Sequence, residues 1–166
     1  MELKLDWHCK TFAELTTGEL YQILKLRNDV FVVEQKCCYM DLDNKDQKSH
    51  HLSGYFNGRL VAFARILPPG VSYEYPSIGR IAVAAEGRGK GFGVELLHVS
   101  IEKTEKLYGK SPIRIGAQRY LKKFYESFGF IQSGDIYLED DTEHMEMTRS
   151  LDWCADLGND FPKLLT

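Results

Sequence analysis

The residues with the most informative spacing form a short glycine-rich run, residues 88–93, which reads R-G-K-G-F-G. Glycine lets consecutive backbone N–H groups approach a bound group closely, and a helix N-terminus carries about half a positive charge. The run lies between a strand expected over residues 77–83 and a helix expected over residues 94–108. With Arg88 and Lys90 beside these N–H groups, we expect the run to bind phosphate oxygens.

Spacing separates this run from two other phosphate-binding loops. A Walker A loop needs G-x-x-x-x-G-K-[ST], and counted from Gly87 its second glycine is replaced by Phe92. A dinucleotide fingerprint needs G-x-G-x-x-G, and its third glycine is replaced by Phe92 or Val94. Both patterns fail, which disfavours a nucleotide-binding protein. A plain glycine-rich turn with solvent-facing charges remains an alternative.

The pattern that does fit is R-x-x-G-x-G, at Arg88, Gly91 and Gly93. A second motif follows at residues 121–130, L-K-K-F-Y-E-S-F-G-F. In this order the two motifs resemble the GNAT superfamily of acetyl-CoA-dependent acyltransferases. The stretch R-N-D-V-F-V-V-E-Q, which begins at Arg27, and A-x-A-R, which ends at Arg65, are similar to its ElaA-like branch.

This resemblance implies an α/β architecture, the GNAT fold, in which a mixed and mostly antiparallel twisted sheet of about six to seven strands carries helices on both faces. It also implies acetyl-CoA (coenzyme A) as the co-substrate, with the pantetheine arm along the strand and the pyrophosphate on the glycine-rich run. The cofactor-binding residues expected from it are Ile81, Ala82, Val83, Arg88, Gly89, Lys90, Gly91, Phe92, Gly93, Gln118, Phe124 and Tyr125.

Acyl transfer to an amine requires removal of a proton, stabilisation of an oxyanion and protonation of the departing thiolate. By resemblance, the backbone N–H of Val83 donates to the oxyanion, and Tyr125 lies near the cofactor sulfur. A phenol with an ordinary pKa of about 10 could protonate a thiolate with a pKa near 8.5. Alternatively, Tyr125 belongs only to the apolar face of its helix, with Phe124 and Phe128.

The general base is less evident, because the strand over residues 77–83 contains no carboxylate where many GNAT enzymes have one. Glu34, His51 and His144 are the candidate catalytic bases or acceptor contacts, and a histidine pKa of about 6.5 suits work near neutral pH. Each has a structural alternative. Glu34 could pair with Arg27 on one helix face, and the histidines could be ordinary strand and hairpin residues. A water-mediated base, or none, also remains open.

Three acidic residues, Asp41, Asp43 and Asp46, lie in the longest irregular stretch of the chain. Their spacing is like that of a calcium loop, but the glycine at its sixth position and the glutamate at its twelfth are missing. We expect a polar loop that attracts a cationic amine, or a solvated surface. Cys37 and Cys38 lack zinc spacing and are expected to be buried thiols, so no metal is expected.

The elements that position these residues follow from hydrophobic periodicity and turn signals. Asn57-Gly58 predicts a hairpin, Thr16 and Glu19 have the spacing of a capping box, and Gly109 is a candidate helix terminator. We expect helices over residues 19–30, 94–108 and 121–128, and strands over residues 3–7, 51–56, 59–67, 77–83, 113–117, 130–138 and 145–148.

Composition sets the outer limits. The chain has 166 residues, of which 43% are hydrophobic and 27% charged, and this suits one globular domain. Its formal net charge of −3 offers no general attraction to nucleic acid or anionic lipid. No signal core and no apolar stretch of membrane-spanning length occurs, so we expect a cytoplasmic protein. We expect a single GNAT domain over residues 1–150 and a C-terminal extension with a short helix over residues 151–166.

The expected reaction is transfer of an acetyl group from acetyl-CoA to the amine of a small molecule or peptide, by direct attack in a ternary complex. An acyl-cysteine intermediate is disfavoured, because no cysteine lies in the cofactor motifs. The alternative is a non-catalytic acyl-CoA-binding or regulatory module. The expected partners are the amine acceptor and a second copy of the chain in a homodimer, with neither nucleic acid nor a membrane.

Overall fold

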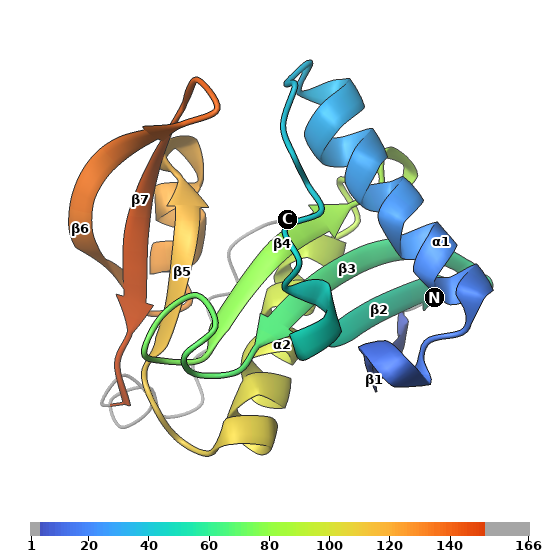
Figure 1. Ribbon diagram of the computed structural model, residues 1–166, viewed down its shortest axis with the longest axis horizontal. Coiled ribbons are helices and arrows are strands. Elements are labelled where there is room, and N and C mark those ends of the chain that lie inside the picture. The colour runs from blue at the N-terminus through green and yellow to red at the C-terminus, as the bar shows by residue number, and fades with distance from the viewer. Residues whose placement is uncertain (1–3, 152–166) are drawn as a thin grey trace.

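A computed structural model describes residues 4–151, and within them one seven-stranded sheet has the order β1-β2-β3-β4-β5-β7-β6 (Figure 1). All neighbours are antiparallel except β4 and β5, which are parallel. The strands are β1 (Asp6–Thr11), β2 (His50–Phe56), β3 (Arg59–Leu67), β4 (Ser77–Val83), β5 (Ile113–Gln118), β6 (Phe130–Glu139) and β7 (Thr142–Arg149).

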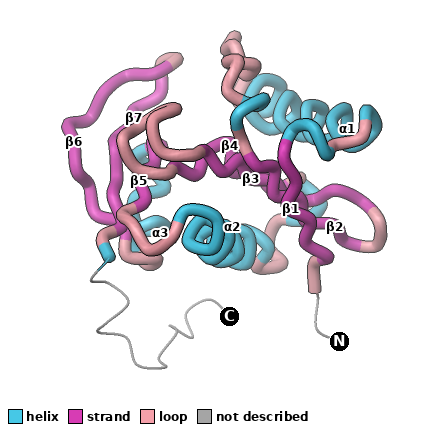
Figure 2. The backbone as a smooth tube through the Cα atoms, turned by 60° about the horizontal axis from the view of Figure 1, so that its bottom comes forward, coloured by secondary structure: helices cyan, strands magenta, loops and turns pink. Residues whose placement is uncertain are grey.

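Helices cover both faces of this sheet. The helix α1 (Thr17–Arg27) lies on one face, and α2 (Phe92–Tyr108) and α3 (Lys122–Glu126) lie on the other (Figure 2). The expected α/β fold, with a mixed and mostly antiparallel sheet, is therefore confirmed. Among residues 4–151, no helix is both long and apolar enough to cross a membrane. The short helix expected near the C-terminus falls on residues that lie almost wholly outside those described.

Several local signals act as expected. Thr16 and Glu19 form a reciprocal capping box, in which the Thr16 hydroxyl accepts from the Glu19 N–H at 3.1 Å and the Glu19 carboxylate accepts from the Thr16 N–H at 2.8 Å. Asn57 (φ 50°) and Gly58 (φ 77°) form the left-handed turn between β2 and β3. Gly109, with a φ of 77°, ends α2.

Two boundaries differ from the expectation, and one of them matters for the site. The first strand begins at Asp6, later than residue 3. The last hairpin has only a two-residue turn, because Asp140 (φ 49°) and Asp141 (φ 60°) both adopt the left-handed conformation. His144 therefore lies inside β7, opposite Tyr137 in β6, and its side chain has a fixed direction relative to the sheet.

The sheet divides between its two parallel strands. The pair Ser77 and Arg114 is the single register contact between β4 and β5, and beyond it the two strands separate (Figure 1). Toward Val83, the edge of β4 that faces β5 therefore has no strand partner among residues 4–151. On both sides of the division the core is apolar and closed, with Phe63 of β3, Phe92 of α2 and Phe130 of β6 fully buried.

Candidate active site

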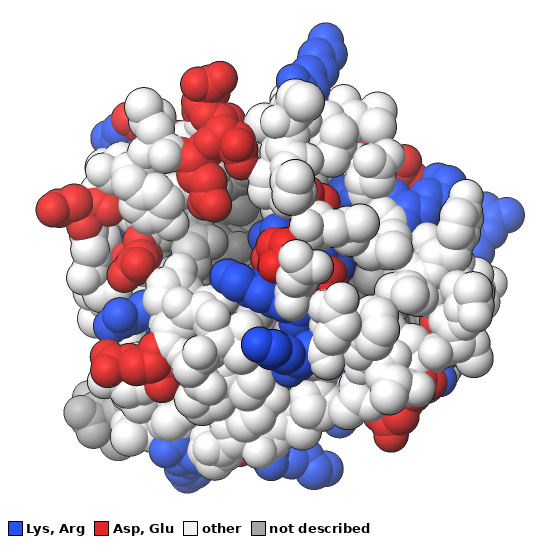
Figure 3. Space-filling model, in the orientation of Figure 1, with Lys and Arg blue, Asp and Glu red and all other residues white. Residues whose placement is uncertain are grey.

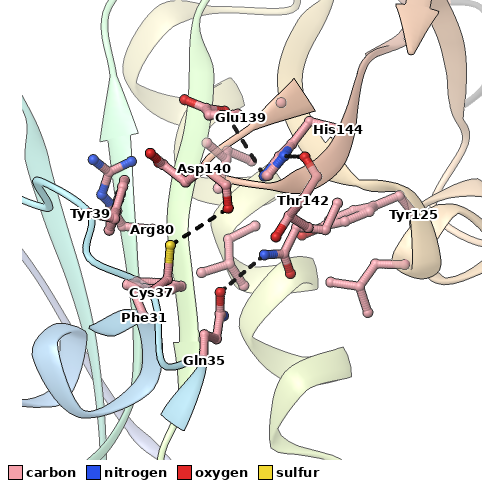
Figure 4. A pocket seen from close by; sticks show the side chains of 16 residues that line it. Phe31, Gln35, Cys37, Tyr39, Arg80, Tyr125, Glu139, Asp140, Thr142 and His144 are labelled. Carbon is pink, nitrogen blue, oxygen red and sulfur yellow. Dashed lines mark hydrogen bonds and ion pairs between the residues drawn. The ribbon is translucent and has the colours of Figure 1, made fainter. Parts of the chain in front are cut away.

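A cavity of about 160 Å³ opens where the two halves of the sheet separate (Figure 4). One wall is β4, and the other is formed by β5, α3 and the β6–β7 turn. The segment that follows α1 lies across from that turn. The lining residues are Phe31, Gln35, Cys37, Tyr39, Ile78, Gly79, Arg80, Ile81, Gly116, Gln118, Leu121, Tyr125, Glu139, Asp140, Thr142 and His144.

A bulge in β4 shapes the first wall. The register between β3 and β4 shifts by one residue between Phe63 and Arg65, so one extra residue of β4 is accommodated where Arg80 adopts a φ of 51°. A left-handed non-glycine residue inside a strand costs about 1–2 kcal/mol, and bulges commonly re-aim a strand beside a site. The bulge therefore coincides with the part of β4 that turns away from β5.

The backbone of Val83 is directed into the division of the sheet. The N–H of Ala84 donates to the carbonyl of Val61 at 2.8 Å, so Ala84 and Val61 form a hydrogen-bonded pair. Val83 and Ala62 are the next pair along the two strands. Hydrogen-bonded and non-hydrogen-bonded pairs alternate in an antiparallel ladder. The polar groups of Val83 therefore point away from β3, and its carbonyl accepts from Arg88 instead. Two residues earlier, Ile81 lines the cavity itself.

The glycine loop, residues 88–93, leads from β4 into the first turn of α2 and presents backbone N–H groups at the start of that helix. Gly89 (φ 72°) and Gly91 (φ 81°) are left-handed, and Gly91 is the N-cap of α2. Within the described residues, no backbone acceptor engages the N–H groups of residues 89–93. These free donors at a helix start, with two basic side chains nearby, have the chemistry that pyrophosphate needs.

The side chain of one predicted cofactor residue, Phe92, is buried and leaves only its backbone accessible to a ligand. The side chain of Phe92 is 1% exposed and packs against Phe56 with ring centroids 5.4 Å apart. It therefore anchors the first turn of α2 in the core. A Cβ at Gly87 would lie 3.2 Å from both Phe92 and Val83, so this glycine lets the loop pass close to the core.

The basic side chains of the loop already have partners. Arg88 donates to the Val83 carbonyl at 3.1 Å and to the Glu34 carboxylate at 2.7 Å. Lys90 donates to the carbonyl of Glu86 at 2.6 Å. The alternative pair between Glu34 and Arg27 does not form, because the chain continues beyond α1 as a π-helix (Asn28–Glu34) and carries Glu34 to the glycine loop. Glu34 is placed to influence anion binding.

Tyr125 extends from α3 into the cavity (Figure 4). Its residue is 6% exposed, and burial raises the pKa of its hydroxyl well above the ordinary value. The described residues provide no hydrogen-bond partner for this hydroxyl. Phe124 stacks edge-on against its ring at 5.3 Å and so supports Tyr125 from within an aromatic cluster. Gln118 donates to Gln35 across the cavity at 3.3 Å.

His144 has the geometry of a proton acceptor. Its Nδ1 donates to the Thr142 carbonyl at 2.8 Å, and this bond leaves Nε2 without a proton in the neutral ring. Nε2 lies 3.9 Å from a carboxylate oxygen of Glu139. The imidazole ring stacks on the Tyr137 ring, with the two ring centroids 5.9 Å apart. The side chain is only 14% exposed and lines the cavity, so Nε2 can receive a proton there.

His51, the other candidate histidine, is not brought to this site. It is 1% exposed, and its Nε2 donates to the Asp46 carbonyl at 3.0 Å. Its Nδ1 is buried without a partner, and burial lowers its pKa. His51 does not line the cavity, so its burial in β2 argues against a role as the base and for a structural one.

The three aspartates do not form the polar, amine-attracting loop that their spacing suggested. Each of them bridges two arginines, and each arginine bridges two aspartates, so the ion pairs close into a ring. We name this set the charge ring; its members, in order around it, are Arg27, Asp41, Arg80, Asp43, Arg65 and Asp46. Three positive and three negative charges cancel, and little attraction is left for an external cation.

The charge ring is tightly bonded and largely buried. Arg27 is fully buried and lies 2.8 Å from Asp41 and 2.7 Å from Asp46. Arg80 donates to Asp41 at 2.7 Å, and Arg65 donates to Asp43 at 2.7 Å. Because the ring joins α1, β3 and β4 to the loop before β2, it fixes that loop above the bulge.

The adjacent cysteines are not buried together as expected. Cys37 is half-buried, lines the cavity and donates to the Asp140 carbonyl at 3.6 Å, whereas Cys38 is exposed. Burial raises the pKa of the Cys37 thiol, which disfavours its thiolate. Over residues 4–151, no group of three histidine, cysteine or carboxylate side chains could hold a metal ion.

Comparison with known proteins identifies the architecture. The profile of the Acetyltransferase (GNAT) domain matches residues 22–151. Protein ElaA of Escherichia coli is 38% identical over 149 residues, which are 89% of this chain and 97% of that protein. Its crystal structure superposes with a TM-score of 0.82 over 88% of this chain and 99% of that one.

Two further solved structures are similar. An acyl-CoA N-acyltransferase from Pseudomonas aeruginosa is 40% identical and superposes with a TM-score of 0.85, over 89% of this chain and all of that one. A GNAT family acetyltransferase from Elizabethkingia anophelis, solved with acetyl-CoA bound, is 17% identical with a TM-score of 0.63, over 89% of this chain and 98% of that one. The latter likeness concerns the fold alone.

Proposed function

The chain belongs to the GNAT acetyltransferase family, and from that premise we propose that it transfers an acetyl group from acetyl-CoA to a primary amine by direct attack in a ternary complex. Family membership itself supports acyl transfer from an acyl-CoA. The observation that carries the proposal further is the cavity, in which an unpartnered Tyr125 hydroxyl and the bare Nε2 of His144 line the space beside the free edge of β4.

Two parts of the chain would hold acetyl-CoA. The free edge of β4 at Ile81 offers backbone groups to the pantetheine amides, while the Val83 N–H serves the thioester carbonyl. The glycine loop offers the N–H groups of residues 89–93 and the charges of Arg88 and Lys90 to the pyrophosphate. Once bound, acetyl-CoA supplies a thioester whose carbonyl carbon forms the new C–N bond while its C–S bond breaks, which yields an amide and free thiol.

His144 is the proposed base. An amine attacks only when its nitrogen lone pair is free, so a proton must leave that nitrogen. Nε2 of His144 accepts this proton, because Nδ1 already donates its own to the Thr142 carbonyl. The Glu139 carboxylate, 3.9 Å from Nε2, stabilises the resulting imidazolium. The proton then passes to solvent, which returns His144 to its neutral form.

Tyr125 and Val83 stabilise charge as it develops. The raised pKa of Tyr125 makes full proton transfer to a thiolate unfavourable, since a thiolate has a pKa near 8.5. We therefore assign Tyr125 a hydrogen bond to the departing sulfur. The nitrogen loses a second proton to solvent as the amide forms, and the thiolate takes its proton from solvent. The backbone N–H of Val83 donates to the carbonyl oxygen during attack, and such a donor is typically worth about 2.7–4 kcal/mol.

Release of free thiol from acetyl-CoA tests the proposal. The assay uses a panel of small amines, polyamines and peptides, and Tyr125→Phe serves as the comparison variant. We expect turnover with at least one acceptor, a slower variant, and thermal stabilisation by acetyl-CoA but not by ATP. Stabilisation by acetyl-CoA without turnover on any acceptor would instead indicate a non-catalytic acyl-CoA-binding module, and stabilisation by ATP alone would overturn both assignments.

A further inference from the structure

The turn between β6 and β7 places two carboxylates at the cavity and a third next to them in sequence. We name Glu139, Asp140 and Asp141 the acidic rim; the first two line the cavity, and the last two form the left-handed turn. Acidic side chains gather over this turn beside a hollow in the surface (Figure 3). Glu139 and Asp140 line the same cavity as Tyr125 and His144 (Figure 4).

Unlike the other acids near the cavity, the acidic rim has no lysine or arginine as a partner within the described residues. Glu143 pairs with Arg119 at 2.7 Å, and Glu146 lies 3.9 Å from Arg114. Asp41 and Asp43 are neutralised inside the charge ring, which also occupies the guanidinium of Arg80 in the cavity wall. Glu139 has only His144 nearby, at 3.9 Å.

The floor of the cavity supplies independent evidence that a ligand occupies it. The Tyr125 residue is 6% exposed, yet no described residue satisfies its hydroxyl. Because Tyr125 lines the cavity, its hydroxyl is available to a group that enters there. A volume of about 160 Å³ is smaller than a pocket for a drug-sized ligand, and it suits the end of an aminoalkyl chain.

We propose that the acceptor is a dicationic amine, whose reacting amine enters the cavity beside His144 while a second positive group stays at the acidic rim. This inference rests on the proposed acyl transfer. The reacting amine arrives as an ammonium ion, which Glu139 attracts before His144 removes the proton. The second ammonium remains charged and meets Asp140 and Asp141, so the rim selects for charge beyond the reacting nitrogen.

Three acceptors with the same four-carbon chain isolate this second charge. In 1,4-diaminobutane the distal group is an ammonium, in butylamine a methyl and in 4-aminobutanoate a carboxylate. We expect kcat/KM at low salt to be highest for 1,4-diaminobutane, about tenfold lower for butylamine and about tenfold lower again for 4-aminobutanoate. Added salt should reduce the advantage of the diamine and leave butylamine nearly unchanged, because screening acts on the distal charge.

Substitutions in the turn provide the matched test. Asparagine tolerates the left-handed conformation, so Asp140→Asn and Asp141→Asn remove charge while the turn persists. Each should raise KM for the diamine by about two- to fivefold and leave butylamine unchanged. Asp135→Asn, which removes an exposed charge elsewhere on β6, is the control and should change neither.

Calorimetric titration of 1,4-diaminobutane into the CoA-bound protein measures the site without turnover. Weaker binding to Asp140→Asn than to the parent and to Asp135→Asn is expected. Thiol release that is equal for all three acceptors would leave acyl transfer intact and overturn the dicationic acceptor. Absence of thiol release together with rim-dependent diamine binding would overturn the catalytic proposal while the binding site stands. Absence of both would overturn the rim as an acceptor site.

Discussion

Nε of Arg80 lies 2.7 Å from Oδ1 of Asp41, and this contact ties the left-handed residue of β4 to the loop before β2. The same guanidinium also donates to the Asp41 carbonyl at 3.0 Å and to the Asp43 carboxylate at 3.3 Å. These bonds offset the strain of the bulge, which costs about 1–2 kcal/mol. The division of the sheet, and with it the cavity, is thus held open by buried electrostatics.

Replacing Asp41 should therefore destabilise the protein strongly. The Asp41→Asn substitution leaves the buried Arg27 and the partly buried Arg80 short of one negative charge, and removal of one partner from a buried pair costs about 3–5 kcal/mol. Urea unfolding measures the loss. The control is Asp29→Asn, because Asp29 forms an exposed pair with Lys25 and should change stability by only about 0.3–0.5 kcal/mol. Equal effects of the two variants would contradict a structural role for the charge ring.

The charge ring should also set the acid limit of stability. Burial alone would raise the pKa of Asp43, but the hydrogen bond and charge of Arg65, with the charge of Arg80, outweigh it and lower the pKa. The pKa of Asp46 is lowered in the same way, because the effect of its burial is outweighed by the hydrogen bonds and charges of Arg27 and Arg65. Because the unfolded pKa is about 3.9, this stabilisation is complete above about pH 4 and is lost as pH falls below it.

Unfolding free energies measured from pH 7 to pH 3 check this window. Asp43→Asn should be less stable at pH 7 and should lose less stability than the parent protein below pH 4, because one of the titrating carboxylates is gone. An unchanged acid slope would mean that other carboxylates control acid unfolding.

His51 should act in a separate and higher pH window. Burial lowers its pKa in the folded protein, whereas the unfolded value is about 6.5. The unfolded chain thus takes up the proton first, so stability is complete above about pH 6.5 and falls as pH decreases, by at most about 1.4 kcal/mol per pH unit. His51→Gln, whose amide could still donate to the Asp46 carbonyl, should flatten the curve between pH 7 and pH 5. A curve that keeps the slope of the parent would show that His51 does not titrate there.

Local patterns predicted most of the fold because they depend on neighbours in sequence. The strand over residues 77–83 and the Asn57-Gly58 hairpin were found at their observed places, since period-two alternation and left-handed turn residues are local features. The π-helix after α1 follows no such pattern, and it redirected Glu34 from Arg27 to Arg88.

The site was only partly predictable for the same reason. Motif spacing predicted the glycine loop and Tyr125 as parts of the site, and the structure places Tyr125 in the cavity. The charge ring joins residues that are distant in sequence, and the arginine at the bulge adopts a φ that its residue type does not favour. The acidic turn of β6 and β7 was visible as composition, but its position over the cavity depends on the pairing of β5 with β7.

Glu34 should weaken binding of CoA by competing for Arg88. The two side chains are 2.7 Å apart and both are substantially exposed, so a pyrophosphate must displace or share this contact. Glu34→Gln should tighten CoA binding about two- to fivefold, and Arg88→Ala should weaken it about tenfold or more, as measured by calorimetry. Glu102→Gln, an exposed charge change on α2, is the control. Weaker binding by Glu34→Gln would instead indicate that Glu34 orients Arg88 for the ligand.

His144 and Tyr125 should differ in how much each contributes to kcat. Loss of a positioned base typically lowers kcat by about 10²–10⁴-fold. The effect of His144→Gln should fall in this range, because the substitution removes the proton acceptor. It leaves every group of the glycine loop in place. Tyr125→Phe removes one hydrogen bond to a charged sulfur and should lower kcat by roughly ten- to a hundredfold. In both variants KM for acetyl-CoA should stay near that of the parent protein. His8→Gln, at the far edge of the sheet in β1, should leave both constants unchanged. A fall of less than about threefold for His144→Gln would show that water removes the amine proton, and the function of the His144–Glu139 pair would then be to bind the incoming ammonium.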